Sequence, residues 1–295
     1  MTALSEETMS RLAFIRYQYG LAVEQAGQPE PANALSVNWL HDSVELTLQL
    51  ASELANVQIR PKSKPHMMDY FGLLDPRFPP NGLAQRNAMN RLNEARVALK
   101  HHGTRPATSD ILALRASVTA FFEENIPRVF GISFDQIAMS QLVTQLEARS
   151  HLQTAETQAA AGDREEAVNS TAIAFAYLLR AYHAVEPEVR ASSAPISHLL
   201  GGAPRHDFSE VISFVERLID AVNTLQRRVE WLAIGAYPPR MRRFSRLTPS
   251  VMIAYAGNWR MSTRPRSVPL TDLDVRFCYE FVIEVALTLQ KSVFS

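Results

Sequence analysis

The residues with the clearest chemical potential stand together in LNEARVALKHHG, residues 92–103. Arg96 precedes His101 by five residues and His102 by six, and Gly103 follows directly. A guanidinium group can hold a phosphate through paired hydrogen bonds, and an imidazole can donate or accept a proton near neutral pH. These are the two groups needed to cut RNA without a metal ion. Arg96, His101 and His102 are therefore the candidate catalytic residues.

This segment is expected to form the last turns of an amphipathic helix. An apolar residue recurs every three or four positions, at Ala84, Ala88, Leu92, Ala95 and Leu99. Such spacing is typical of a helix with one buried face. Gly103 can end that helix because glycine readily adopts the left-handed conformation found after a last helical turn.

Helical geometry separates the candidate residues into faces. At about 100° per residue, Asn93 and Lys100 lie within roughly 60° of Arg96, where they can bind the flanking phosphate or ribose. His101 lies about 140° from Arg96 on the polar side, whereas His102 falls at the edge of the apolar stripe. His101 is therefore the better candidate for proton transfer, and His102 is expected to pack against the core.

Two arrangements would bring Arg96 and His101 to one phosphate. The last helical turn can unwind at Gly103, or two copies of the helix can face each other so that a dimer shares the site. The C-terminal end of a helix also favours a charged imidazolium, which suits a general acid. The sequence leaves both arrangements open.

Residues 1–135 are expected to form a bundle of four or five helices. Ser5, followed by two glutamates, predicts the start of the first helix, and Ser36 predicts the start of the second. The third helix carries the Arg96 segment. Ser109 or Asp110 begins a fourth, whose inward residues are Ile111, Leu114, Val118, Phe121 and Phe122. Five prolines between residues 57 and 82 exclude a long helix there, which leaves a functional loop or a plain connection.

Residues 136–295 are expected to form a second helical domain. The apolar spacing predicts helices over residues 134–160, 165–185, 208–236 and 272–293. Short apolar runs around Gly257 and Asn258 predict a small β-hairpin. The predicted fold class is therefore all-α, with room for one such hairpin.

An arginine-rich segment, residues 237–266, lies within this second domain. The formal net charge of the chain is zero, yet residues 227–266 hold nine arginines and one acid. Arginines contact phosphates and aromatic rings stack on unpaired bases, so Arg240, Arg242 and Arg243 are candidates for binding RNA. The aromatic residues interleaved with them are Tyr237, Phe244, Tyr255 and Trp259. The alternative is that these arginines pair with acidic residues of the stretch 141–226, or with a partner protein.

Several classes of site and location are not expected. Cys278 is the single cysteine, so no internal disulfide and no cysteine-rich metal site can form. The sequence lacks the motifs of zinc enzymes, P-loop NTPases, kinases and serine hydrolases, so no metal and no cofactor are expected. His41 and Asp42 could orient a catalytic histidine from a neighbouring helix or could simply be structural. No apolar run reaches the roughly 18 residues of a membrane span and no signal peptide begins the chain, so a cytoplasmic protein is expected.

The Arg96 segment and the order of helices resemble the HEPN superfamily, whose members carry an Arg-x4–6-His motif late in a core helix. The resemblance covers roughly residues 5–130 and rests on Arg96 with His101 or His102. It implies a helical bundle, a homodimer and a metal-independent endoribonuclease that acts on RNA in a bacterial toxin or antiviral defence system. An antitoxin or defence-system protein would then be a partner. Val97 departs from the pattern, because active members usually carry a polar residue directly after the arginine.

A different class of function is the leading alternative. A helical bundle of this kind could be a non-catalytic interaction module that binds a protein partner or RNA. Arg96 and the two histidines would then be ordinary surface residues that complement the dipole at a helix end.

Overall fold

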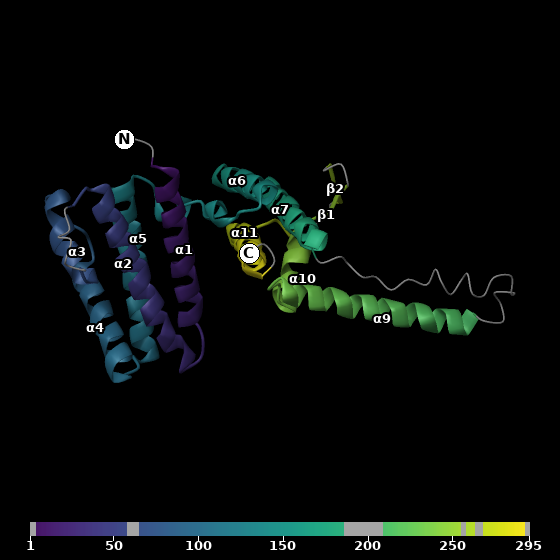
Figure 1. The fold of residues 1–295 in the computed structure, drawn as a ribbon, viewed down its shortest axis with the longest axis horizontal. Helices are drawn as coiled ribbons and strands as arrows, with labels where there is room; N and C mark the ends of the chain where they lie inside the picture. The colour runs from purple at the N-terminus through teal and green to yellow at the C-terminus, as the bar shows by residue number, and fades with distance from the viewer. Residues whose placement is uncertain (1–3, 58–64, 186–208, 255–257, 263–267, 293–295) are drawn as a thin grey trace. The chain divides into compact units, whose positions relative to one another are not determined.

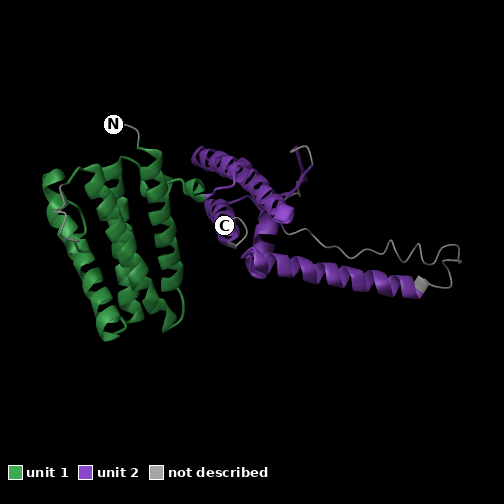
Figure 2. Cartoon of the chain, in the orientation of Figure 1, with its two compact units in different colours: residues 1–142 green, residues 143–295 purple. Residues whose placement is uncertain are grey.

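A computed structural model describes residues 4–57, 65–185, 209–254, 258–262 and 268–292 of the chain, and every structural statement refers to these residues. Their regular structure is almost entirely helical (Figure 1). Strands β1 (Ser250–Ile253) and β2 (Trp259–Ser262) pair antiparallel. The predicted all-α class with a small hairpin is confirmed. The chain divides into two compact units, residues 1–142 and 143–295 (Figure 2).

Unit 1 is a bundle of four long helices with one short helix beside them (Figure 1). The long helices are α1 (Glu6–Ala26), α2 (Ser36–Leu54), α4 (Arg86–His102) and α5 (Thr108–Phe130), and the short one is α3 (Met67–Leu74). All the apolar residues predicted to face inward from the fourth helix, α5, are buried. Phe121 and Phe122 of α5 lie in the centre of the core with Phe71 of α3, because the three rings pack edge to face in series.

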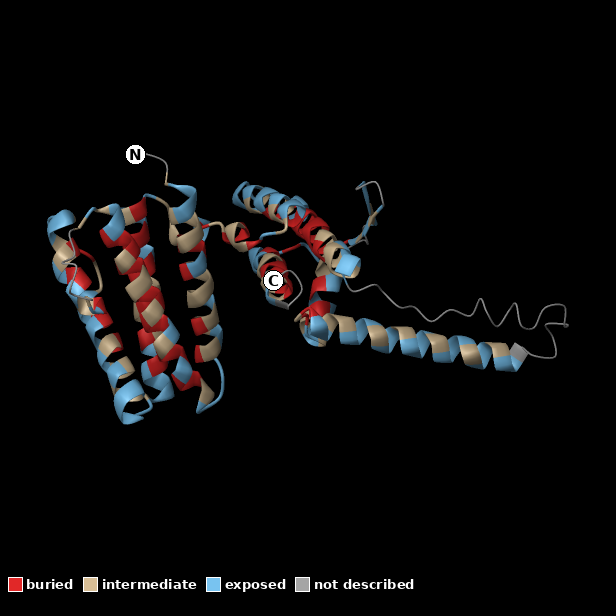
Figure 3. Ribbon diagram, viewed as in Figure 1, coloured by how far each residue is buried: buried red, intermediate tan, exposed pale blue. Residues whose placement is uncertain are grey.

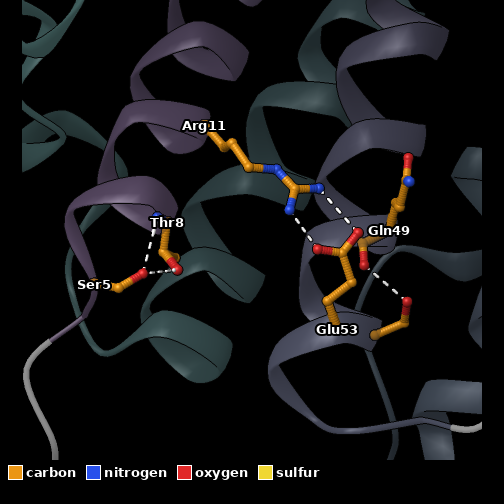
Figure 4. A network of polar contacts seen from close by, with 6 residues as sticks. Ser5, Thr8, Arg11, Gln49 and Glu53 are labelled. Atoms are coloured by element: carbon orange, nitrogen blue, oxygen red, sulfur yellow. Dashed lines mark hydrogen bonds and ion pairs between the residues drawn. The ribbon is translucent and has the colours of Figure 1, made fainter.

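Two polar contacts stabilise the end of this bundle where α1 begins and α2 ends (Figure 4). The hydroxyl of Ser5 accepts a hydrogen bond of 3.1 Å from the amide of Thr8 and so caps α1, as the sequence predicts. The guanidinium of Arg11 on α1 forms a two-point ion pair with the carboxylate of Glu53 on α2. This pair lowers the pKa of Glu53, chiefly through the hydrogen bonds that Arg11 donates.

The proline-rich stretch contains more structure than a loop. Helix α3 carries Met67 and Phe71 into the core of unit 1, since both side chains are almost fully buried. After it, the carboxylate of Asp75 accepts hydrogen bonds from the amide of Leu83 at 3.0 Å and from Arg86 at 2.6 Å. These bonds hold the chain where α4 begins. Residues 58–64, which include Lys62 and Lys64, lie outside the described residues.

The predicted helix over residues 134–160 is wrong in its first part. Short 3₁₀ turns occupy Phe134–Gln136 and Met139–Leu142, and α6 begins only at Leu146. The reason is packing: the ring of Phe134 stacks on Phe122 with centroids 4.5 Å apart, which ties this segment to the core of unit 1. Unit 1 therefore extends to residue 142, beyond the boundary expected after residue 135.

Unit 2 is built on a pair of antiparallel helices. These are α6 (Leu146–Ala160) and α7 (Arg164–Val185), which turn at Gly162 as the sequence predicts. Helix α11 (Asp272–Ser292) packs on α7, and the rings of Phe175, Phe244 and Phe281 fill the space between α7, α10 and α11.

Helix α9 (Ser209–Ala233) matches the predicted helix over 208–236 closely. Pro238 and Pro239, which follow that predicted helix, start α10 (Pro238–Leu247). Proline suits the first turn of a helix because its missing amide proton would have no partner there. This short helix was missed in the sequence, and it carries three of the candidate arginines.

Candidate functional site

The Arg96 segment forms the C-terminal half of α4. The helix stays regular through His102 and ends at Gly103, whose φ of +66° is left-handed as expected. The amide of Gly103 donates to the carbonyl of Leu99 at 3.2 Å, and the amide of Thr104 donates to the carbonyl of Ala98 at 3.1 Å. These bonds complete the last turn, so the helix does not unwind before Gly103. The first of the two predicted ways to unite Arg96 with His101 is therefore absent from the structure.

Both histidines stand on the surface. His101 is exposed as predicted, and His102 is exposed too, which shows the expectation that it packs against the core to be wrong. The physical reason is that α4 runs past the core: its last fully buried side chain is Leu92, and Leu99 is only partly covered. No hydrogen bond or ion pair joins either imidazole, Lys100 or Arg96 to another residue that the structure describes.

Arg96 belongs to the inward-facing side of α4. It follows Met89 and Asn93 at spacings of seven and three residues, so the three share one face of the helix. Met89 is fully buried, Asn93 contacts α2, and Arg96 is half-buried. Arg96 therefore extends the face of α4 that packs on α2. On this regular helix His101 points about 140° away from it.

Asn93 forms the polar link between α4 and α2. Its Oδ1 lies 3.2 Å from Nε2 of His41, a side chain that is only 3% exposed. The other ring nitrogen of His41, Nδ1, lies 3.5 Å from Asp42 and 3.9 Å from Glu45. The sequence singled out His41, Asp42 and Asn93 separately. Only the fold shows that His41 contacts Asn93. No described contact joins His41 to His101 or His102.

His41, Asp42 and Glu45 are also the one group of three side chains, among the residues described, that could hold a metal ion. Their ligand atoms all lie within 4.8 Å of one another. Asn93 presents its carbonyl oxygen to Nε2, which can only accept, so Nε2 of His41 is the donor in this contact.

The candidate arginines of α10 differ in their surroundings. Arg240 forms a two-point ion pair with Glu284 of α11. Arg243 binds Asp274 of α11 at 3.2 Å, and its guanidinium lies 4.1 Å from the ring centroid of Phe277. These two arginines therefore pair within the fold, with carboxylates of α11.

Arg242 lies on the other side of α10. It is exposed and has no hydrogen-bonding or ionic partner within the described part of the chain, and Arg246, one helical turn later, is similarly placed. Among the interleaved aromatic residues Tyr237 and Trp259 are exposed, whereas Phe244 is buried in the core of unit 2 and cannot stack on a base. Tyr255 lies outside the described residues.

Comparisons with known proteins give this site no precedent. The chain matches no family model, and no curated protein or solved structure is significantly similar to it. Within the described residues no helix has the length and apolar character to cross a membrane.

Proposed function

We propose that unit 1 is a metal-independent endoribonuclease of the HEPN type. The observation that supports this most directly is the end of α4, where Lys100, His101 and His102 stand exposed beside the half-buried Arg96. Among the described residues none of these side chains is neutralised by an acid. A group of unpaired basic side chains at the end of a helix can bind a phosphodiester.

The chemistry follows from the residue types. The 2′-hydroxyl of a ribose attacks the adjacent phosphorus, and the bond from phosphorus to the 5′-oxygen breaks. His101 transfers protons: a neutral imidazole takes the proton of the 2′-hydroxyl, and an imidazolium gives one to the leaving 5′-oxygen. Arg96 stabilises the charge that builds up on the phosphorane oxygens. The products are a 2′,3′-cyclic phosphate and a 5′-hydroxyl.

The site is proposed to form between two copies of the chain. Because α4 is regular through His102, Arg96 and His101 of one copy point about 140° apart and do not meet at one phosphate. Two α4 helices related by a two-fold axis can place Arg96 of one copy beside His101 of the other. A homodimer then carries two such sites.

Asn93 and Lys100 have supporting roles in this proposal. Lys100 is exposed near Arg96 on the helix surface and holds a flanking phosphate as a point charge. The carbonyl oxygen of Asn93 accepts a hydrogen bond from His41, and its NH₂ group can donate a hydrogen bond to the ribose. His41 is thus a positioning residue, which acts through Asn93.

Unit 2 supplies a surface for RNA in the same proposal. Arg242 contacts the phosphate backbone, while Arg240 and Arg243, which pair with α11, orient α10. The resemblance to HEPN proteins further suggests a cytoplasmic protein of a bacterial toxin or antiviral system, with an antitoxin or another defence protein as partner.

A second function has its own supporting observation. Helix α9 exposes apolar side chains along its whole length, which is typical of a surface that binds protein. A non-catalytic interaction module that binds a protein partner or RNA is therefore the alternative to the nuclease.

RNA cleavage in the presence of EDTA separates the two functions. The nuclease cuts RNA under these conditions and loses activity in Arg96→Ala and His101→Ala, and the fragments carry cyclic phosphate ends. Arg91→Ala is the control, since Arg91 is an exposed arginine of the same helix without a partner among the described residues. Intact RNA, or equal activity in all variants, would leave the binding module as the better interpretation.

A further inference from the structure

No residue of helix α9 from 210 to 233 is buried (Figure 3), and the exposed ones include a row of large apolar side chains. Between 37% and 64% of each is accessible to solvent. They are Val211, Phe214, Leu218, Val222, Leu225, Val229 and Leu232. An isolated apolar residue on a surface needs no explanation, but a row that runs along 25 residues of helix does.

Six of the seven residues in this row belong to a heptad repeat, which the half-buried Val215 completes. If Val222 is given position a, then Val215 and Val229 also fall at a, and the d positions hold Val211, Leu218, Leu225 and Leu232. We call these seven a and d residues the α9 seam. Valine at a with leucine at d is the combination that favours two parallel strands over trimers and tetramers. The seam spans more than three heptads, the length at which such a pattern indicates a coiled coil.

The charges of α9 are placed to suit such a pair. Glu210, Glu216, Arg217, Asp220, Arg227 and Glu230 all fall at positions b, c or f, away from the seam. Arg228 is the one charge at a g position. In a parallel pair g faces the following e position of the partner helix, which here is the uncharged Ala233. No like charges therefore oppose the pairing.

The described contacts of unit 2 with α9 involve a different side of the helix. Near its C-terminal end α9 packs against α10, and Glu230, at position b, lies 3.6 Å from His183 of α7. Leu225, Val229 and Leu232 in the same stretch remain exposed. The contacts with the described fold thus leave six of the seven seam residues exposed, and Val215 is half-buried.

We propose that the α9 seam pairs with the same seam of a second copy of this chain as a parallel two-stranded coiled coil. A second copy is the occupant that the a and d residues specify, because the pattern is complementary to itself. The proposal is independent of RNA cleavage. If unit 1 is a nuclease, the coiled coil would also raise the local concentration of the second α4 helix.

The first test is the mass of the full-length chain in solution, measured by light scattering during size-exclusion chromatography. The wild-type protein is expected at twice the mass of one chain. Leu218→Glu with Leu225→Glu is expected to shift it to the mass of one chain, whereas Arg217→Glu with Thr224→Glu, at position c, leaves the dimer intact. A monomeric wild-type protein, whose seam is then covered within its own chain, overturns the proposal. So does a dimer that the seam variants leave unchanged.

The second test introduces no charge into the seam. Val211→Cys places a thiol at the first d position of the seam, while the native Cys278 is buried. In a parallel pair the two new thiols face each other, and oxidation yields a covalent dimer; Arg227→Cys at the outward position f serves as the control. Failure of Val211→Cys to cross-link better than Arg227→Cys contradicts the parallel arrangement. A complex with a different protein in place of the second copy also overturns the proposal.

Discussion

Nε2 of His41 on α2 lies 3.2 Å from Oδ1 of Asn93 on α4, which makes these two residues the polar link between the helix that carries the catalytic candidates and its neighbour. The imidazole is almost fully buried, whereas Asn93 is only half-buried. A change at His41 should therefore affect both the stability of the bundle and the position of α4.

His41→Ala is expected to lower the free energy of unfolding of the protein by about 1–3 kcal/mol, because it removes a buried ring and leaves the polar group of Asn93 without its partner. The measurement is chemical denaturation followed by circular dichroism. His101→Ala is the control, since that ring is exposed and its loss should change stability by no more than about 0.5 kcal/mol. Equal effects of the two substitutions would argue against a structural role for the His41–Asn93 contact.

The Arg11–Glu53 pair predicts a weak acid sensitivity of unit 1. Arg11 lowers the pKa of Glu53, so the ionised carboxylate contributes stability above the ordinary glutamate value of about 4.3 and loses this contribution as the pH falls toward the lowered pKa. Both side chains are about a third exposed or more, which limits the effect to roughly 1 kcal/mol. Glu53→Gln should flatten this part of the pH dependence of stability. An unchanged slope below pH 4.3 would mean that the pair contributes nothing in solution.

Arg242 and Arg240 should behave differently although they are two residues apart. Arg242→Ala is expected to weaken RNA binding and to reduce the slope of log affinity against log salt by about 1, because one phosphate contact is lost. Arg240→Ala should mainly destabilise unit 2, because it leaves Glu284 half-buried without its cation. Filter binding over a range of salt concentrations, together with thermal unfolding, separates these effects. An unchanged salt slope in Arg242→Ala would exclude this arginine from the RNA surface.

The sequence predicted best what depends on local spacing. Ser5 at the start of α1, Gly103 at the end of α4 and the buried face of α5 all follow from capping and periodicity within one segment, and the structure confirms each of them. The same local reasoning placed the hairpin of β1 and β2.

What the sequence could not show depends on contacts between distant segments. Phe134 stacks on Phe122 and thereby turns a predicted helix into 3₁₀ turns, and Asn93 meets a histidine 52 positions earlier in the chain. The ion pairs of Arg240 and Arg243 with α11 are of the same kind. The α9 seam, in contrast, depends on local spacing alone. Its valines and leucines recur at heptad positions in the sequence, a pattern that predicts a coiled coil as well as a helix.

The proposed site joins Arg96 of one copy to His101 of another, and complementation tests this most directly. Arg96→Ala alone and His101→Ala alone should each reduce RNA cleavage in EDTA by about 10²-fold or more. When the two variants are co-expressed, half of the dimers should be mixed and each should hold one competent site, so about a quarter of the wild-type activity returns. Wild-type protein that leaves RNA intact, or an equal mixture that stays as inactive as either variant alone, would contradict the shared site.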